Sequence, residues 1–195
     1  MIEDFGECNS WFDDAFRDKC GARFPTFKIA LNLLLQNGGK NIVETGTIRQ
    51  FEDYGAGYST YIFGSFIKMY GGNITTIDID GDNMEVCRAV TREFEELINY
   101  VVEDSLTALT KITEPIDLLY LDSLDTPLEG DATKAQEHNL KEFKIVEHLL
   151  HDKSVVLLDD NFFENGGKTR LTKKYLHEKG WKLLFNSQQS LWVKN

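Results

Sequence analysis

The sequence predicts an α/β protein built as a three-layer α/β/α sandwich around a mostly parallel, seven-stranded sheet. Short and continuously apolar segments alternate with helical segments along most of the chain, as expected for parallel strands covered on both faces. The chain closes with two strand segments joined by four residues, Asn186-Ser-Gln-Gln189, which predicts a C-terminal hairpin and an antiparallel last strand.

The first half of the chain contains three predicted helices and three predicted strands. A long helix is expected over residues 10–37 because glycines follow it directly, and a later helix ends at another glycine pair. The segment NITTIDI is rich in β-branched residues and predicts a strand. The expected order is helix 10–37, strand 41–44, helix 59–70, strand 73–79, helix 82–97 and strand 100–103.

The second half repeats the alternation. IDLLYL and SVVLL are apolar throughout and predict buried strands, and Gly180 closes the last helix. The expected order is helix 106–111, strand 116–121, helix 134–151, strand 154–158, helix 167–179, strand 181–185 and strand 190–193. With 195 residues and no linker-like tract, we expect one compact unit, with residues 1–40 as a helical cap on a ligand-binding domain over 41–195.

Composition narrows the class of protein. The formal net charge is −11, and such a surface repels phosphate backbones, so nucleic acid is not expected as a partner. No apolar stretch is long enough for a transmembrane helix and the N-terminus lacks a signal-peptide pattern, which predicts a cytoplasmic protein without a membrane partner. A homodimer is considered only because dimers are the commonest oligomers.

Acidic residues follow every strand of the predicted parallel set. Ligands of open α/β sheets bind beyond the carboxyl ends of the strands, so these residues are candidates for a site. Each of them has a second interpretation, because aspartate also caps the helix that follows a strand. The segments concerned begin at Glu44, Asp78, Glu103, Asp122 and Asp159.

The same segments carry a family resemblance. IVETGT, YGAGYST, TTIDID, EDS, LLYLDS and VVLLDDN resemble, in this order, the motifs of class I S-adenosylmethionine-dependent methyltransferases, which have a Rossmann-like fold. The chain looks most similar to small-molecule O-methyltransferases of the macrolide-sugar (macrocin) and catechol types. The resemblance implies S-adenosylmethionine as cofactor and a small-molecule acceptor. The cofactor-binding residues that it implies are Glu44, Thr45, Gly46, Gly57, Ser59, Thr60, Asp78, Asp104, Ser105 and Asp122.

Two other classes remain open at this point. An NAD(P)-dependent oxidoreductase would share a ribose-binding carboxylate such as Asp78. The glycine pattern argues against it, because Gly55 and Gly57 come about ten residues late and Thr60 stands at the third glycine position. A carboxylate at Glu44 would also oppose a pyrophosphate. The third class is a non-catalytic cofactor-binding module.

A divalent metal ion is the second predicted ligand. Two carboxylates and one amide oxygen at the ends of neighbouring strands form an oxygen-only ligand set suited to Mg²⁺. The segment LLDDN resembles the Asp-Asn pair of catechol-type enzymes. Such an ion would bind a substrate hydroxyl and favour its deprotonation. The predicted ligands are Asp122, Asp159, Asp160 and Asn161.

The predicted catalytic residues are Asp122 and His138. His138 lies early in a helix that starts near the active edge, and AQEHNLKE resembles a segment of the macrolide-sugar group. It could act as general base or contact the substrate. Five aromatic residues could cover the acceptor, and Trp11 and Phe12 are the better candidates among Phe51, Tyr54, Tyr58, Trp11 and Phe12. The basic cluster Lys168, Arg170, Lys173 and Lys174 is interpreted as a solvated helix face.

Overall fold

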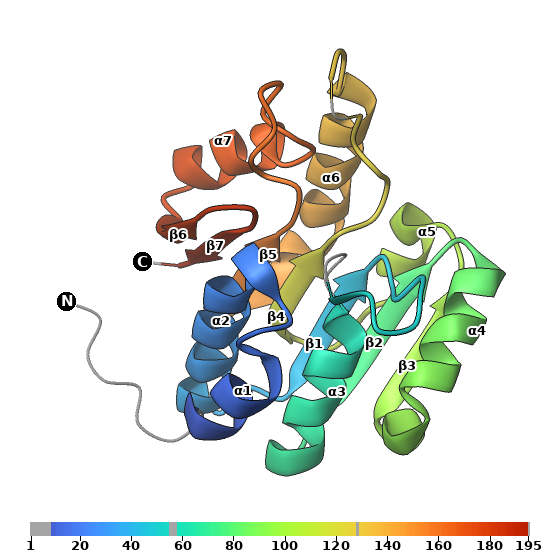
Figure 1. Ribbon diagram of the computed structural model, residues 1–195. Helices are drawn as coiled ribbons and strands as arrows, with labels where there is room; N and C mark the ends of the chain where they lie inside the picture. Colours follow the sequence, from blue (N-terminus) through green and yellow to red (C-terminus); the bar gives the residue numbers. More distant parts are fainter. Residues whose placement is uncertain (1–8, 55–57, 128, 195) are drawn as a thin grey trace.

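The predicted α/β/α sandwich is confirmed by a computed structural model, which describes residues 9–54, 58–127 and 129–194. Seven strands form one sheet in the order β3-β2-β1-β4-β5-β7-β6 (Figure 1). The last strand is antiparallel to both of its neighbours, and β1 to β5 run parallel. The strands are β1 (Asn41–Thr45), β2 (Asn73–Asp78), β3 (Ile98–Val102), β4 (Ile116–Leu121), β5 (Leu150–Leu158), β6 (Lys182–Asn186) and β7 (Ser190–Val193).

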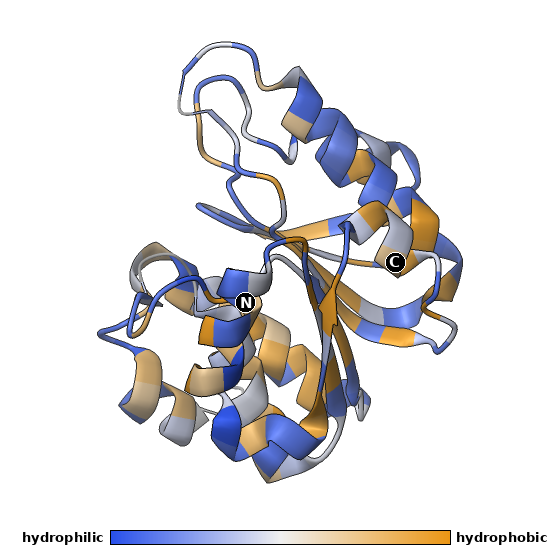
Figure 2. Ribbon diagram, turned by 90° about the vertical axis from the view of Figure 1, so that its right-hand side faces the viewer, coloured by the Kyte–Doolittle hydropathy of each residue, from blue (hydrophilic) through white to orange (hydrophobic). Residues whose placement is uncertain are grey.

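Helices cover both faces of the sheet, and the strands between them are largely hydrophobic (Figure 2). Consecutive residues of β1 point to opposite faces of the sheet and are buried by different helices. Ile42 belongs to the apolar cluster with residues of α1, α2 and α3, whereas Val43 belongs to the cluster with residues of α5, α6 and α7. A smaller cluster joins α3 and α4. The helices are α1 (Asn9–Phe16), α2 (Phe24–Asn37), α3 (Ser59–Tyr70), α4 (Gly81–Val90), α5 (Ser105–Leu109), α6 (Thr133–Val146) and α7 (Arg170–Glu178).

Several predicted helices are shorter than expected. The helix predicted over 10–37 is broken between α1 and α2, where Gly21 has a φ of +50° and Pro25 stands in the first turn of the next helix. The helix predicted over 82–97 ends at Thr91, whose hydroxyl donates to the carbonyl of Cys87, and a 3₁₀ helix follows. The helix predicted over 134–151 ends earlier, and β5 already begins at Leu150.

A buried ion pair fastens the N-terminal helices to the sheet. Nε of Arg23, just before α2, donates to Oδ2 of Asp159 at 2.8 Å, and the Asp159 side chain has no exposed surface. The same carboxylate accepts hydrogen bonds from the Tyr120 hydroxyl and, at 2.9 Å, from the Gln189 amide. Thr26 in the first turn of α2 also bonds to Gln189. The start of α2 is therefore held by the ends of β4, β5 and β7.

No helix in the described part of the chain has the length and apolar character needed to span a bilayer.

Removing the guanidinium of Arg23 should destabilise the fold strongly. Arg23→Ala leaves the buried Asp159 carboxylate without its cation, and breaking a buried pair costs about 3–5 kcal/mol of the free energy of unfolding. Arg17→Ala is the matched control, because Arg17 pairs with Asp13 at the surface and is 58% exposed, where such pairs contribute about 1 kcal/mol or less. Urea unfolding of both variants measures the difference, and equal small losses would contradict the anchoring role of Arg23.

Candidate functional site

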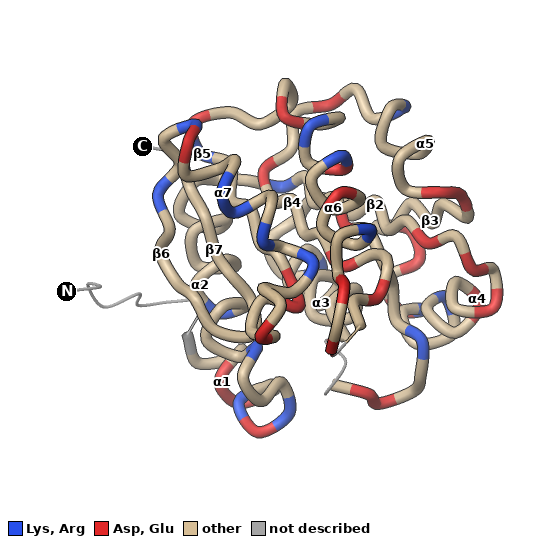
Figure 3. Tube along the Cα trace, turned by 90° about the horizontal axis from the view of Figure 1, so that it is seen from above, with Lys and Arg blue, Asp and Glu red and all other residues tan. Residues whose placement is uncertain are grey.

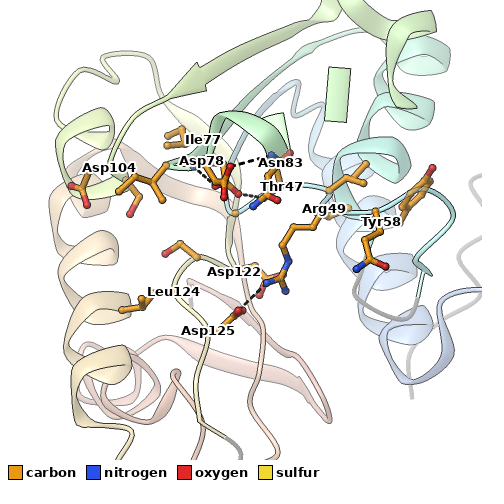
Figure 4. Close-up of a pocket in the computed structure, with 18 of the residues that line it drawn as sticks. Thr47, Arg49, Tyr58, Ile77, Asp78, Asn83, Asp104, Asp122, Leu124 and Asp125 are labelled. Atoms are coloured by element: carbon orange, nitrogen blue, oxygen red, sulfur yellow. Dashed lines mark hydrogen bonds and ion pairs between the residues drawn. The ribbon is translucent and has the colours of Figure 1, made fainter. Parts of the chain in front are cut away.

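A cavity of about 380 Å³ opens at the carboxyl edge of the parallel strands. Its walls come from the segments that follow β1, β2, β3 and β4, together with one residue of α6 (Figure 4). The strands are aligned so that Thr45 pairs with both Ile77 and Leu121, which brings their ends to one level. The predicted residues that line this cavity are Gly46, Ser59, Asp78, Asp104, Ser105, Asp122 and His138.

The remaining predicted cofactor residues lie behind the cavity or outside the described chain. Glu44, Thr45 and Thr60 are fully buried and do not line the cavity. Thr60 is 3.2 Å from the hydroxyl of Thr47, which is itself at the wall. Gly57 lies outside the described residues.

Gly46 lets two loops cross at the centre of the site. Its φ is +81°, and a Cβ atom there would lie 2.5 Å from the carbonyl oxygen of Asp122. Glycine is the residue that accepts both the left-handed conformation and this close approach. The loop after β1 can therefore pass directly over the end of β4.

Asp78 lies at the end of β2 with its carboxylate held by backbone amides. Oδ1 accepts from the amide of Asp80 at 2.8 Å, and Oδ2 accepts from the amide of Thr47 at 3.2 Å. Burial raises the pKa of Asp78, and these amides limit the rise. The carboxylate is thus fixed in orientation and faces the cavity (Figure 4).

Glu44 is a buried carboxylate without a hydrogen-bond partner among the described residues. Burial raises its pKa to about 7; the hydroxyls of Thr60, Thr76 and Ser59 favour the charged form and limit the rise, although none reaches either oxygen with hydrogen-bond geometry. A buried polar group in this condition is costly. A cationic ligand nearby would offset that cost.

His138 belongs to the wall formed by α5 and α6. Its Nε2 lies 3.0 Å from the hydroxyl of Ser105 and 3.4 Å from Oε1 of Glu142. Glu142 is fully buried and also accepts a hydrogen bond from Ser123 at 2.5 Å. Asp104, beside Ser105, caps α5 by accepting a hydrogen bond from the amide of Thr107. It therefore both lines the cavity and caps a helix, the two roles considered for the aspartates that follow strands.

The loop that follows β1 reaches across the mouth of the cavity. Nη1 of Arg49 donates to Oδ2 of Asp125 in the loop after β4, at 2.8 Å (Figure 4). Both side chains are half or more exposed, so the pair contributes little to stability. Arg49 was not predicted, because a single charged residue in a long loop carries no pattern. Asp125 ends the strand-end segment Asp122-Ser-Leu-Asp125, which the sequence did mark as a candidate.

The predicted Mg²⁺ ligand set does not form. Asp159 is taken up by Arg23. Asn161 faces the β6–β7 hairpin: its amide nitrogen donates to Asn186 and to the carbonyl of Ser187, both at 2.7 Å. The oxygen of Asn161 accepts from the side chains of Thr169 and Lys173. This ligand prediction is therefore corrected on the geometry of the side chains themselves.

The backbone after β5 explains the divergence. Asp160 has a φ of +53°, a left-handed conformation that turns the chain, so Asn161 faces the β6–β7 hairpin whereas Asp159 and Asp160 both lie near Arg23. Asp160 lies apart from the cavity lining, whereas Asp122 contributes to it. Within residues 9–54, 58–127 and 129–194, no group of three or more His, Cys, Asp or Glu side chains is arranged to hold a metal ion.

A lysine connects the two remaining carboxylates. Nζ of Lys168 lies 2.7 Å from Oδ1 of Asp122 and 3.2 Å from Oδ2 of Asp160, and the lysine side chain is 1% exposed. The expectation that Lys168 belongs to a solvated basic face is therefore wrong for this residue, although basic positions do gather on the neighbouring α7 (Figure 3). The pair of glycines directly before it, Gly166-Gly167, was the signal for a tight turn at this point.

Trp11 and Phe12, the aromatic residues expected to cover the acceptor, pack in the core, and the carboxylate of Asp122 lies at the cavity. Phe12 is fully buried in the core and Trp11 packs on its ring edge, so neither residue lines the cavity. Burial raises the pKa of Asp122 to about 7, and Lys168 limits the rise.

Comparisons with known proteins agree with this architecture. The sequence matches the family described as "Methyltransferase domain" over residues 53–161, more than half of the chain. No curated protein sequence matches it significantly.

Several solved structures share the fold at low sequence identity. The S-adenosylhomocysteine-bound methyltransferase PaMTH1 of Podospora anserina has 14% identity and a TM-score of 0.65, covering 95% of this chain and 85% of that one. The calicheamicin methyltransferase CalS11 has 12% identity and a TM-score of 0.64, covering 87% and 77%. The O-methyltransferase NovP has 12% identity and a TM-score of 0.63, covering 89% and 80%. The chain belongs to the methyltransferase-domain family, so the class of enzyme predicted from its sequence, a methyltransferase, is confirmed.

Proposed function

We propose that the cavity binds S-adenosylmethionine and that the enzyme transfers its methyl group to a hydroxyl of a small-molecule acceptor. The observation that carries this proposal is the convergence of Gly46, Asp78, Asp104 and Asp122 on one cavity. Its volume of about 380 Å³ is in the usual range for small-molecule sites. The O-methyltransferase names of NovP and of CalS11, the latter described as a TDP-rhamnose 3′-O-methyltransferase, support an oxygen acceptor.

Asp78 is suited to a ribose diol. Its two oxygens are held by the amides of Thr47 and Asp80, so the carboxylate keeps its orientation before the ligand arrives. Hydrogen bonds from hydroxyls to a charged acceptor are stronger than those to a neutral one. Asp104 and Ser105 follow the neighbouring strand β3, and we assign them to the adenine end.

Glu44 is suited to the positive end of the cofactor. Its carboxylate lies beside Ser59, which lines the cavity. S-adenosylmethionine carries a sulfonium and an ammonium group, and either charge favours the ionised form of a nearby buried carboxylate. The absence of a hydrogen-bond partner for Glu44 among the described residues fits a site that is completed by its ligand.

The chemistry needs an electrophilic methyl group, which the sulfonium supplies, and a base for the acceptor. The acceptor oxygen forms a bond to the methyl carbon as the carbon–sulfur bond breaks, and the sulfur keeps the electron pair. Asp122 is our candidate for the base that accepts the proton of the acceptor hydroxyl, because it lines the cavity and its pKa of about 7 suits a base at neutral pH. His138 is the second candidate for the base. Its contact with Ser105, which we assign to the adenine end of the cofactor, favours contact with the cofactor over the role of base.

Calorimetric titration of the purified protein with S-adenosylmethionine, S-adenosylhomocysteine and NADH tests the proposed cofactor. Both nucleosides should bind with one site per chain and NADH should not. Methyl-labelled cofactor with a panel of hydroxylated acceptors, compared with their amine analogues, then tests the acceptor class. Binding of NADH alone would favour the oxidoreductase alternative.

Replacing Asp78 should weaken cofactor binding selectively. Asp78→Ala removes the charged acceptor at the end of β2 and should raise the dissociation constant of S-adenosylhomocysteine about tenfold to hundredfold. Asp82→Ala is the control, because Asp82 lies in the first turn of α4 and outside the cavity lining. Calorimetry gives both constants, and an unchanged value for Asp78→Ala would remove the ribose assignment.

The buried carboxylate of Glu44 should make stability depend on pH. Its pKa is about 7 in the folded protein and 4.5 ordinarily, so the folded state holds the proton more tightly, and wild-type stability falls as pH rises through this interval. Glu44→Gln does not titrate. The free energy of unfolding of the variant relative to wild type should therefore rise by about 2–3 kcal/mol between pH 5 and pH 8. Urea unfolding without cofactor measures this difference, and a pH-independent difference would contradict the assignment.

A further inference from the structure

Lys168 occupies the position between two carboxylates where a divalent cation was predicted. Its ammonium is buried, whereas the side chains of Asp122 and Asp160 remain 21% and 19% exposed. The lysine therefore contacts both carboxylates from the protein side. The hydroxyl of Tyr120, which donates its one proton to Asp159, lies 3.1 Å from Oδ2 of Asp122, so Lys168 is the cation that holds Asp122.

Cations of the fold itself offset two of the three negative charges at this end of the sheet. Asp122, Asp159 and Asp160 bring three carboxylates together, and Lys168 and Arg23 bring two cations. These two side chains supply the same positive charge as one divalent metal ion. A metal ion between Asp122 and Asp160 would also lie close to the ammonium group, which repels it.

The backbone holds the lysine in this place. Gly167 has a φ of +61°, and a Cβ atom there would lie 1.7 Å from the carbonyl oxygen of Asp160. Only a glycine can pack so closely, so the turn before Lys168 is fixed against the residue that the lysine contacts. Left-handed φ values at a non-glycine residue such as Asp160 are kept only where surrounding contacts enforce them.

We propose that the ammonium group of Lys168 takes the place of a divalent cation in this methyltransferase, and that it acts as a positioning residue that holds Asp122 at the cavity wall. The positioning role of Lys168 rests on the proposed function, in which Asp122 accepts the proton of the acceptor hydroxyl. The replacement of the cation does not rest on it and can be tested without knowing the acceptor.

Mn²⁺ is the probe, because it accepts the same oxygen ligands as Mg²⁺ and is visible by electron paramagnetic resonance. Wild-type protein saturated with S-adenosylhomocysteine should bind no stoichiometric Mn²⁺. Lys168→Ala should expose two uncompensated carboxylates and bind one Mn²⁺ per chain at least tenfold more tightly than wild type. Lys168→Arg should behave as wild type, and Lys168→Ala with Asp160→Asn should lose the acquired site.

Thermal unfolding provides a readout that a merely structural lysine would not change. Mn²⁺ at a hundred times its dissociation constant should raise the melting temperature of Lys168→Ala by roughly 5–10 °C and leave wild type unchanged. Lys173→Ala is the matched control: it removes a lysine that contacts Asn161 rather than a carboxylate, and it should show no such rise.

Two results would overturn the proposal. One is a stoichiometric Mn²⁺ site in wild type that Asp122→Asn abolishes, a measurement that needs no lysine variant to fold. The other is a folded Lys168→Ala protein that gains no Mn²⁺ affinity. Titration with S-adenosylhomocysteine on the same samples separates these results from a failure of the proposed function, which would appear as absent cofactor binding.

Discussion

A carboxylate that is cut off from water requires a cation or hydrogen-bond donors beside it, and this requirement shapes the carboxyl edge of the sheet. Asp159 is satisfied by Arg23, Tyr120 and Gln189, which brings the start of α2 and the β6–β7 hairpin to the same point. Asp122 and Asp160 share Lys168. The N-terminal helices, the sheet and the loop after β5 are thus joined by compensation of buried charge.

Glu44 differs from these carboxylates. Among the described residues it is a fully buried carboxylate with neither oxygen hydrogen-bonded, next to a cavity whose other acidic residues are held by amides or cations. We propose that a positively charged ligand offsets this charge, since the other fully buried carboxylates, Asp159 and Glu142, each accept at least one hydrogen bond. The cofactor of a methyltransferase is such a ligand, which connects the electrostatics of the edge with the chemistry of the family.

The sequence predicted the sheet, the antiparallel last strand and the edge at which the site lies, because strand alternation and strand-end residues are local patterns. It also predicted Asp78 and Gly46 at the cavity. It did not predict the side-chain directions of Asp159, Asp160 and Asn161, because these depend on a left-handed φ at Asp160. Arg23 and Lys168 were missed for a related reason: a buried cation looks like a surface cation until its partners, distant in sequence, are known.

We propose that the acidic edge of the sheet binds a sulfonium nucleoside in one cleft and that Lys168, not a metal ion, pairs with the carboxylates of Asp122 and Asp160. A crystal structure of the protein grown with S-adenosylhomocysteine and MnCl₂ tests this most directly, with anomalous diffraction to locate manganese. We predict the ribose at Asp78, the amino-acid end toward Glu44, and no anomalous peak between Asp122 and Asp160. A nucleoside bound elsewhere, or a manganese ion that displaces the Lys168 ammonium, would contradict the account.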